Sequence, residues 1–185
     1  MVVICICNAL TIYLIHCSLW DANEARRVRK FADHTEIVNH CAVAMNNPFL
    51  FASCSDDCSI ILYDIRTKGI VSTFVCEYPI LSVALSGDGE DVIGGGVEGM
   101  IKIWDTQKMG LEERLSLPAH DDIITGLSYH APTSRLLSNG MDNALRVWDV
   151  GAFAENDERR LIQELGGHQV LSFIIFSLSF FLSIC

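Results

Sequence analysis

Residues 136–150 read LLSNGMDNALRVWDV, a small-residue turn followed by alternating apolar residues that end in a tryptophan-aspartate pair. An aromatic residue followed by aspartate closes four stretches of the chain: Trp20-Asp21, Tyr63-Asp64, Trp104-Asp105 and Trp148-Asp149. The intervals between their aspartates are 43, 41 and 44 residues. A fixed period of about 40 residues indicates a repeat architecture, in which neighbouring units bury each other's faces.

Charged residues are confined to the middle of the chain. Residues 1–20 and 170–185 contain no Lys, Arg, Asp or Glu, so every charged side chain lies between Asp21 and Gln169. We therefore divide the chain into a hydrophobic N-terminal segment (1–18), a globular part (19–169) and a hydrophobic C-terminal segment (170–185). The repeats in the globular part end near residues 21, 64, 105 and 149.

The net charge of −10 belongs to the globular part. Affinity for nucleic acid comes mainly from Lys and Arg side chains that neutralise phosphates, so direct nucleic-acid binding is not expected. One segment of the globular part, residues 26–30 (RRVRK), is basic although the net charge is negative. We interpret it as an exposed outer strand with solvated charges, which discourage pairing between sheet edges; a patch for RNA or an acidic partner is the alternative.

The eight cysteines do not form a metal-binding pattern. Cys54 and Cys58 are four residues apart, with no second ligand pair at the spacing of a zinc site. Scattered single cysteines on apolar strands usually act as small buried hydrophobes in a reducing compartment. We predict no metal site and no cofactor.

Each repeat divides into four short apolar runs separated by Gly, Pro, Asn and Asp. The runs are four to eight residues long and rich in β-branched residues, which is typical of strands. The sequence predicts an all-β chain with strands at 37–44, 49–54, 60–65 and 70–75; at 80–85, 91–95, 101–104 and 111–117; and at 123–129, 135–138, 144–150 and 161–165. Residues 19–31 are expected to supply the closing strands of a fourth unit.

These repeats resemble the WD-repeat family, whose units form the blades of a β-propeller. The resemblance implies a structural hydrogen-bond chain of His, Ser, Asp and an aromatic residue in each complete repeat. The first repeat offers His34, Ser53, Asp57 and Tyr63, and the third offers His120, Ser138, Asp142 and Trp148. The residues that close the repeats are Trp20, Asp21, Asp64, Trp104, Asp105 and Asp149.

Ser, His and Asp are also the members of a nucleophilic triad. A hydrolase needs one such set, whereas here the set recurs at the period of the repeat, so we predict a structural role and no enzymatic activity. The middle repeat departs from the pattern, with Glu-Tyr-Pro at 77–79, Gly94 in place of the hydroxyl residue and Glu98 in place of the Asp. We expect this repeat to lack the polar chain and to depend on apolar packing.

Residues 94–96 (GGG), 101–105 (IKIWD) and 136–143 (LLSNGMDN) resemble the spliceosomal members of the WD-repeat family found in the U-five small nuclear ribonucleoprotein. That resemblance implies a non-catalytic scaffold of pre-mRNA splicing, with the large central splicing factor and other ribonucleoprotein components as partners. It implies a nuclear protein; a cytoplasmic one is the alternative.

Two other functions are compatible with the residues. Residues 63–66 (YDIR) are similar to a short signature of substrate receptors in cullin-type ubiquitin ligases. The hydrophobic ends raise a third alternative, a membrane-associated WD-repeat protein. As a helix, however, residues 170–185 would span only about 24 Å, which is shorter than the roughly 30 Å hydrocarbon core of a bilayer.

Propellers of this family usually close with seven blades, and this sequence contains three together with the closing strands of a fourth. The codon for Val170 must begin with GT, the dinucleotide that opens most introns. Cys17-Ser18 can be encoded by TGYAGY, which contains an intron-ending YAG. Our hypothesis is that both hydrophobic ends are translated intron sequence and not native protein.

Overall fold

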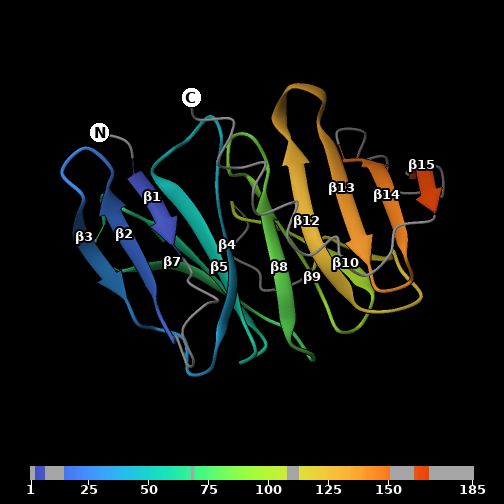
Figure 1. Cartoon of the computed structure of the whole chain (residues 1–185), viewed down its shortest axis with the longest axis horizontal. Coiled ribbons are helices and arrows are strands. Elements are labelled where there is room, and N and C mark those ends of the chain that lie inside the picture. Colours follow the sequence, from blue (N-terminus) through green and yellow to red (C-terminus); the bar gives the residue numbers. More distant parts are fainter. Residues whose placement is uncertain (1–2, 7–14, 68, 108–112, 151–160, 167–185) are drawn as a thin grey trace.

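The computed structural model describes residues 3–6, 15–67, 69–107, 113–150 and 161–166. These residues form four antiparallel sheets and one short 3-10 helix, Ala131–Thr133 (Figure 1). Sheet A contains β1 (Val3–Ile6), β2 (Cys17–Asp21) and β3 (Arg26–Phe31) in spatial order. The prediction of an all-β, partial propeller is confirmed.

The other three sheets are four-stranded meanders, each paired in chain order. Sheet B comprises β4 (Val38–Val43), β5 (Leu50–Ser55), β6 (Ser59–Asp64) and β7 (Ile70–Val75). Sheet C comprises β8 (Ile80–Leu85), β9 (Asp91–Gly96), β10 (Met100–Asp105) and β11 (Leu115–Pro118). Sheet D comprises β12 (Ile124–His130), β13 (Arg135–Gly140), β14 (Ala144–Asp149) and β15 (Leu161–Gly166).

The turn between the second and third strands has the same backbone in sheets B, C and D. Cys58, Gly99 and Asn143 have φ values of 62°, 72° and 61°, and each follows the acidic residue of its repeat. Glycine is required in sheet C, because a Cβ at position 99 would lie 2.5 Å from the carbonyl oxygen of His120. The repeats therefore agree in local conformation where their residue types differ.

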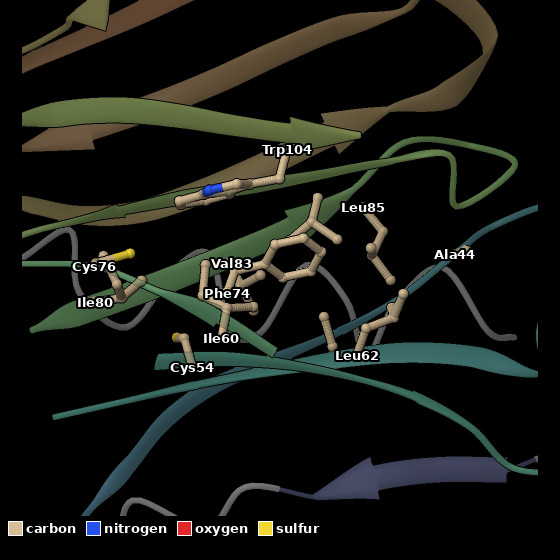
Figure 2. Packing of buried hydrophobic residues seen from close by; sticks show 12 residues of the cluster. Ala44, Cys54, Ile60, Leu62, Phe74, Cys76, Ile80, Val83, Leu85 and Trp104 are labelled. Carbon is tan, nitrogen blue, oxygen red and sulfur yellow. The ribbon is translucent and has the colours of Figure 1, made fainter. Parts of the chain in front are cut away.

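Neighbouring sheets pack face to face through apolar side chains. Between sheets B and C, Trp104 is fully buried among residues such as Ile60 and Leu62, and its ring lies 5.6 Å from that of Phe74 (Figure 2). Trp148 occupies the corresponding place between sheets C and D, and Tyr63 the one between sheets A and B. Each interface thus receives an aromatic ring from the third strand of the later sheet.

The inner strands β4, β8 and β12 are joined by side-chain hydrogen bonds. Leu127 N donates to Ser82 Oγ over 2.9 Å, and His40 Nδ1 lies 3.1 Å from the carbonyl oxygen of Val83 and 3.4 Å from its amide nitrogen. The amide of Asn39 also donates to the carbonyl oxygen of Ile80 over 2.9 Å. These bonds fix how far each sheet is shifted along its inner strand relative to the next sheet.

The predicted N-terminal segment 1–18 contains β1 and the first two residues of β2, and Val3 pairs with Asp21 across these strands. The segment 170–185 lies outside the described residues. Within the ranges that the structure describes, no helix is long and apolar enough to cross a membrane. The boundaries at 18/19 and 169/170, and the non-native origin of the ends, stay predictions.

Candidate interaction face and the polar chains that support it

The third repeat contains a continuous chain of hydrogen bonds. Trp148 Nε1 donates to Ser138 Oγ over 2.9 Å, and Ser138 Oγ lies 2.7 Å from His120 Nε2. His120 Nδ1 lies 2.9 Å from Asp142 Oδ1. If Ser138 donates to Nε2 and Nδ1 donates to the carboxylate, every polar atom of this buried chain has a partner, which is the condition for burying it without a large energetic cost.

The first repeat reproduces most of this chain. His34 Nδ1 lies 2.9 Å from Asp57 Oδ2, and His34 Nε2 lies 2.6 Å from Ser53 Oγ. Ser59, which the sequence did not single out, adds a bond from its hydroxyl to Asp57 Oδ1 over 2.6 Å. Asp57 also accepts a hydrogen bond from the Thr35 amide, so it ties the loop before β4 to the turn between β5 and β6.

Tyr63 takes part through its ring and not through a hydrogen bond. The ring stacks on Phe51 at 4.8 Å, and its buried hydroxyl has no hydrogen-bond partner within the described part of the chain. Burial raises the pKa of Tyr63, so the hydroxyl stays neutral.

Asp142 is the most strongly perturbed carboxylate of the site. Burial alone would raise its pKa, but hydrogen bonds from His120, Arg146 and the Ala144 amide outweigh burial and lower the pKa to about 2. Arg146 Nη1 donates to Asp142 Oδ2 over 2.6 Å and to the carbonyl oxygen of Ala119 over 2.8 Å. Asp57 has a pKa lowered in the same way by Ser59, Thr35 and His34, again against burial.

We expect the protein to lose stability in acid through these two carboxylates. A folded-state pKa below the unfolded value stabilises the fold above the unfolded pKa, and this stabilisation is lost as the pH falls from about 4 to about 2. For Asp142 alone the loss is about 2 kcal/mol. Urea unfolding at pH 5 and pH 2.5 measures it.

The matched control for the acid experiment is Asp142→Asn, which cannot titrate and should therefore show a shallower decline over the same pH range. The control also separates the effect of Asp142 from that of Asp91. Burial raises the pKa of Asp91 in spite of the nearby Arg114, so protonation of Asp91 makes the folded state more stable as the pH falls, which is opposite to the effect of Asp142. Equal slopes for the two proteins would contradict the assignment.

The middle repeat replaces the polar chain with an ion pair. Lys102, which is 7% exposed, lies with its Nζ 2.9 Å from Glu98 and 3.1 Å from Glu113. Burial alone would lower the pKa of Lys102, but hydrogen bonds to the two carboxylates outweigh burial and raise it. Glu98 and Lys102 occupy the places that Asp142 and Arg146 hold in the third repeat. The middle repeat therefore contains a charged cluster in addition to its apolar packing, and we did not predict this cluster.

We expect Lys102→Met to cost about 1–3 kcal/mol of unfolding free energy, because it keeps the apolar stem but leaves two carboxylates without their cation. Adding Glu98→Gln should recover part of this loss, since it removes one of the unpaired charges. Thermal unfolding of the single and double variants measures both effects. Additive losses would show that Lys102 and Glu98 are not coupled.

The repeat-closing aspartates end their strands by accepting hydrogen bonds in the next turn. Asp21 accepts from the Asn23 amide over 2.9 Å, and Asp105 accepts from the Gln107 amide over 2.9 Å. Asp64 accepts from both the amide and the guanidinium group of Arg66. Such turns explain why aspartate follows the aromatic residue. Asp149 ends β14 at the same place, and Trp20 lies half-buried on β2.

Six turns lie together at the end of the sheets next to the His–Asp pairs, and we call this surface the turn face. It consists of residues 32–37, 56–58, 76–79, 97–99, 119–123 and 141–143. Backbone hydrogen bonds connect them in series: Asp56 N to Ile37 O, Cys76 N to Cys58 O, Val97 N to Pro79 O, His120 N to Gly99 O, and Met141 N to Ile123 O. The turn face is therefore one continuous surface.

The turn face is acidic and partly apolar. Its six turns contain nine Asp and Glu residues and no Lys or Arg. Among the described residues, no cation forms a salt bridge with Glu36, Glu77, Asp121 or Asp122. Four large apolar side chains lie exposed between these carboxylates: Ile37, Tyr78, Val97 and Met141. Exposed apolar side chains rimmed by polar groups are typical of protein-binding surfaces.

Two other features singled out in the sequence lie away from the turn face. Arg66 is bonded to Asp64 in its own turn and lies over the Phe49 ring at 4.7 Å. The basic run forms β3, the outer strand of sheet A, where Arg29 donates to the carbonyl oxygen of Thr67. Within the described residues, no group of three potential metal ligands is gathered together.

Comparison with known proteins identifies a pre-mRNA-splicing factor and a small nuclear ribonucleoprotein protein among the relatives. The pre-mRNA-splicing factor cwf17 of Schizosaccharomyces pombe is 38% identical over 110 residues, which cover 60% of this chain and 32% of the relative. The U5 small nuclear ribonucleoprotein 40 kDa protein of Homo sapiens is 39% identical over 108 residues, covering 58% and 30%. The U3 small nucleolar RNA-associated protein 15 homolog of Gallus gallus is 28% identical over 136 residues, covering 74% and 26%.

The chain spans a third or less of the length of these relatives. A family model described as "WD domain, G-beta repeat" matches residues 25–64, 69–105 and 111–149, which together make up more than half of the chain. The matched ranges end at Asp64, Asp105 and Asp149, the aspartates that close the repeats. The chain therefore belongs to the WD-repeat family.

Proposed function

We propose that this protein is a non-catalytic scaffold of the pre-mRNA splicing machinery and that its turn face binds protein partners. The expected partners are the large central splicing factor and other small nuclear ribonucleoprotein components, and the expected location is the nucleus. The observation that carries the proposal is the continuous turn face, with exposed apolar side chains between carboxylates.

The polar chains support this function indirectly. His34 and His120 are buried, and each is held between a serine and an aspartate of its own repeat. A serine whose hydroxyl bonds to a buried imidazole beneath packed strands is not open to a substrate, which favours support of the turns over catalysis. Similarity to proteins named as splicing factors favours the splicing machinery over other settings.

Affinity capture from nuclear extract tests the proposal. The bait is the full chain, and the test variant replaces Ile37, Tyr78 and Met141 with serine. We expect the bait to recover splicing proteins and the variant to lose them, because the substitutions remove exposed apolar contacts without touching the core. Each of these residues is 39–47% exposed, so the variant should have the same melting temperature as the unchanged protein.

A matched control replaces Val71 and Val75 with serine, since these side chains are 46% and 68% exposed but lie on β7, the outer strand of sheet B. Loss of splicing proteins with both variants would assign the interaction to general surface hydrophobicity. Recovery of a ubiquitin-ligase adaptor without splicing proteins would refute the splicing assignment.

A further inference from the structure

The exposed carboxylates of the turn face recur at matching places in sheets B, C and D. Glu36 and Asp122 lie two residues before the first strands of sheets B and D, and Glu77 and Asp121 lie three residues before the first strands of sheets C and D. Those first strands are the inner strands, and side-chain hydrogen bonds join each of them to the next. The four side chains therefore form one row across three sheets, which we call the carboxylate row.

The polar chains hold the backbone beside the carboxylate row. The Thr35 amide donates to Asp57 Oδ2 over 3.0 Å, and the Asp121 amide approaches Asp142 Oδ2 at 3.4 Å. Glu36 and Asp122, the next residues along the chain, are themselves exposed. The buried aspartates thus fix these turns without neutralising the row.

The hairpin turns at the opposite end of the sheets differ in charge. They contain Glu24, Asp88 and Glu90, but also Arg66 and Lys68. The turn face contains carboxylates and no Lys or Arg. Its single sign of charge is therefore a property of this face and does not simply follow from the net charge of the chain.

The carboxylate row fits a partner with several cations better than a single metal ion. Its members belong to three separate turns, and within the described ranges no three potential metal ligands are gathered together. Ile37, Tyr78 and Met141 are 39–47% exposed on the same face, and covering them favours a partner that also carries apolar groups. A polypeptide in which Lys or Arg alternates with apolar residues supplies both.

The basic segment of this chain itself is a poorer fit. Residues 26–30 form β3, which is paired with β2 in sheet A. Arg29 donates to the carbonyl oxygen of Thr67, and Arg26 forms a salt bridge with Glu24. Two of the four cations are therefore engaged within the chain, which disfavours a second copy of this protein as the partner.

We infer that the turn face binds a basic segment of a protein partner, whose Lys or Arg side chains pair with the carboxylate row and whose apolar side chains pack beside it. Opposite charges on two surfaces favour their association and fix its register. The same carboxylates would repel the phosphates of a nucleic acid. The inference rests on the proposed function, because it names the chemistry of the partner for the same face.

Fluorescence anisotropy with three labelled peptides of equal length tests this chemistry. The first peptide alternates Lys with Leu, the second has Gln in place of Lys, and the third has Ser in place of Leu. We expect the full chain to bind the first peptide at least about tenfold more tightly than either of the others, and added salt to weaken this binding by screening. Equal affinity for the first and second peptides would overturn the inference.

A charge variant of the turn face locates the binding site. Glu36→Gln, Glu77→Gln and Asp122→Asn together remove one charge beside each of sheets B, C and D. An amide at position 122 keeps the oxygen that accepts the Ile123 amide. An exposed ion pair typically changes an equilibrium about twofold, so the triple variant should bind the basic peptide about tenfold more weakly. An unchanged affinity would overturn the inference.

The matched control removes three charges at the opposite end of the sheets, through Glu24→Gln, Asp88→Asn and Glu90→Gln. It has the same net charge as the turn-face variant and should change the affinity by less than about twofold. Equal weakening by both variants would assign the binding to net charge and would overturn the inference.

The peptide experiment and the capture experiment fail independently. Capture of splicing proteins through the turn face, without a preference for the basic peptide, would keep the proposed function and overturn this inference. Binding of the basic peptide to the carboxylate row, without capture of splicing proteins, would support this inference and contradict the proposed function.

Discussion

Trp104→Ala is expected to lower the free energy of unfolding by about 3–5 kcal/mol, the largest loss of any single change considered. Trp104 is fully buried between sheets B and C, where its ring packs against Phe74 and Leu62. Truncation would leave a cavity lined by side chains of two sheets, and the strands on either side cannot close it without breaking their registers. Urea unfolding of the full chain measures the loss.

Trp104→Phe is the matched control. Trp104 Nε1 is buried and makes no hydrogen bond within the described part of the chain, so replacing the indole loses volume but no polar contact. We therefore expect a loss well below that of Trp104→Ala. A loss below about 1 kcal/mol for the alanine variant would show that the interface between sheets B and C is not the principal core of the protein.

Asp142→Ala is expected to cost about 1–3 kcal/mol, because it leaves the buried imidazole of His120 and the guanidinium of Arg146 without their shared acceptor. The same change removes the bond from the Ala144 amide that shapes the turn. Thermal unfolding should show the loss at pH 7 and a smaller one at pH 2.5, where the carboxyl has begun to accept a proton.

Asp121→Ala is the control for Asp142→Ala, since Asp121 belongs to the same surface but is exposed and forms no salt bridge within the described part of the chain. Substitutions at such positions usually change stability by less than about 0.5 kcal/mol. An unchanged melting temperature for Asp142→Ala would refute the structural role of the chain from His120 to Asp142.

The strands could be predicted because two local signals agree along most of the chain. Short β-branched runs alternate with turns of Gly, Asn and Asp, and the hairpin at residues 86–89 uses Gly89 at a φ of 81°. Strands β7 and β8 begin and end where the pattern places them, and most other boundaries differ by one or two residues. Strand β11 begins at Leu115, later than expected, and residues 111–112 of the predicted strand lie outside the described residues.

The polar chains could be located by spacing, because the distance from His to Asp is set by a fixed loop, strand and turn. Spacing could not, however, predict which residues belong to each chain. Lys102 lies in an apolar run, where lysine is normally a solvent-facing residue, and its pairing with Glu98 across the turn before β10 has no local sequence signal. The bonds between sheets through His40, Ser82 and Asn39 depend on how the sheets sit on one another, and no local pattern encodes that.

The separation of the sheets has a mechanical consequence. No backbone ladder crosses from sheet B to sheet C or from sheet C to sheet D; within the described ranges the sheets are held together by apolar faces and a few side-chain bonds. Under a pulling force applied at residues 15 and 166, these contacts between sheets should break before the backbone hydrogen bonds within each sheet. The chain should then extend in discrete steps, each releasing one four-stranded sheet as a unit.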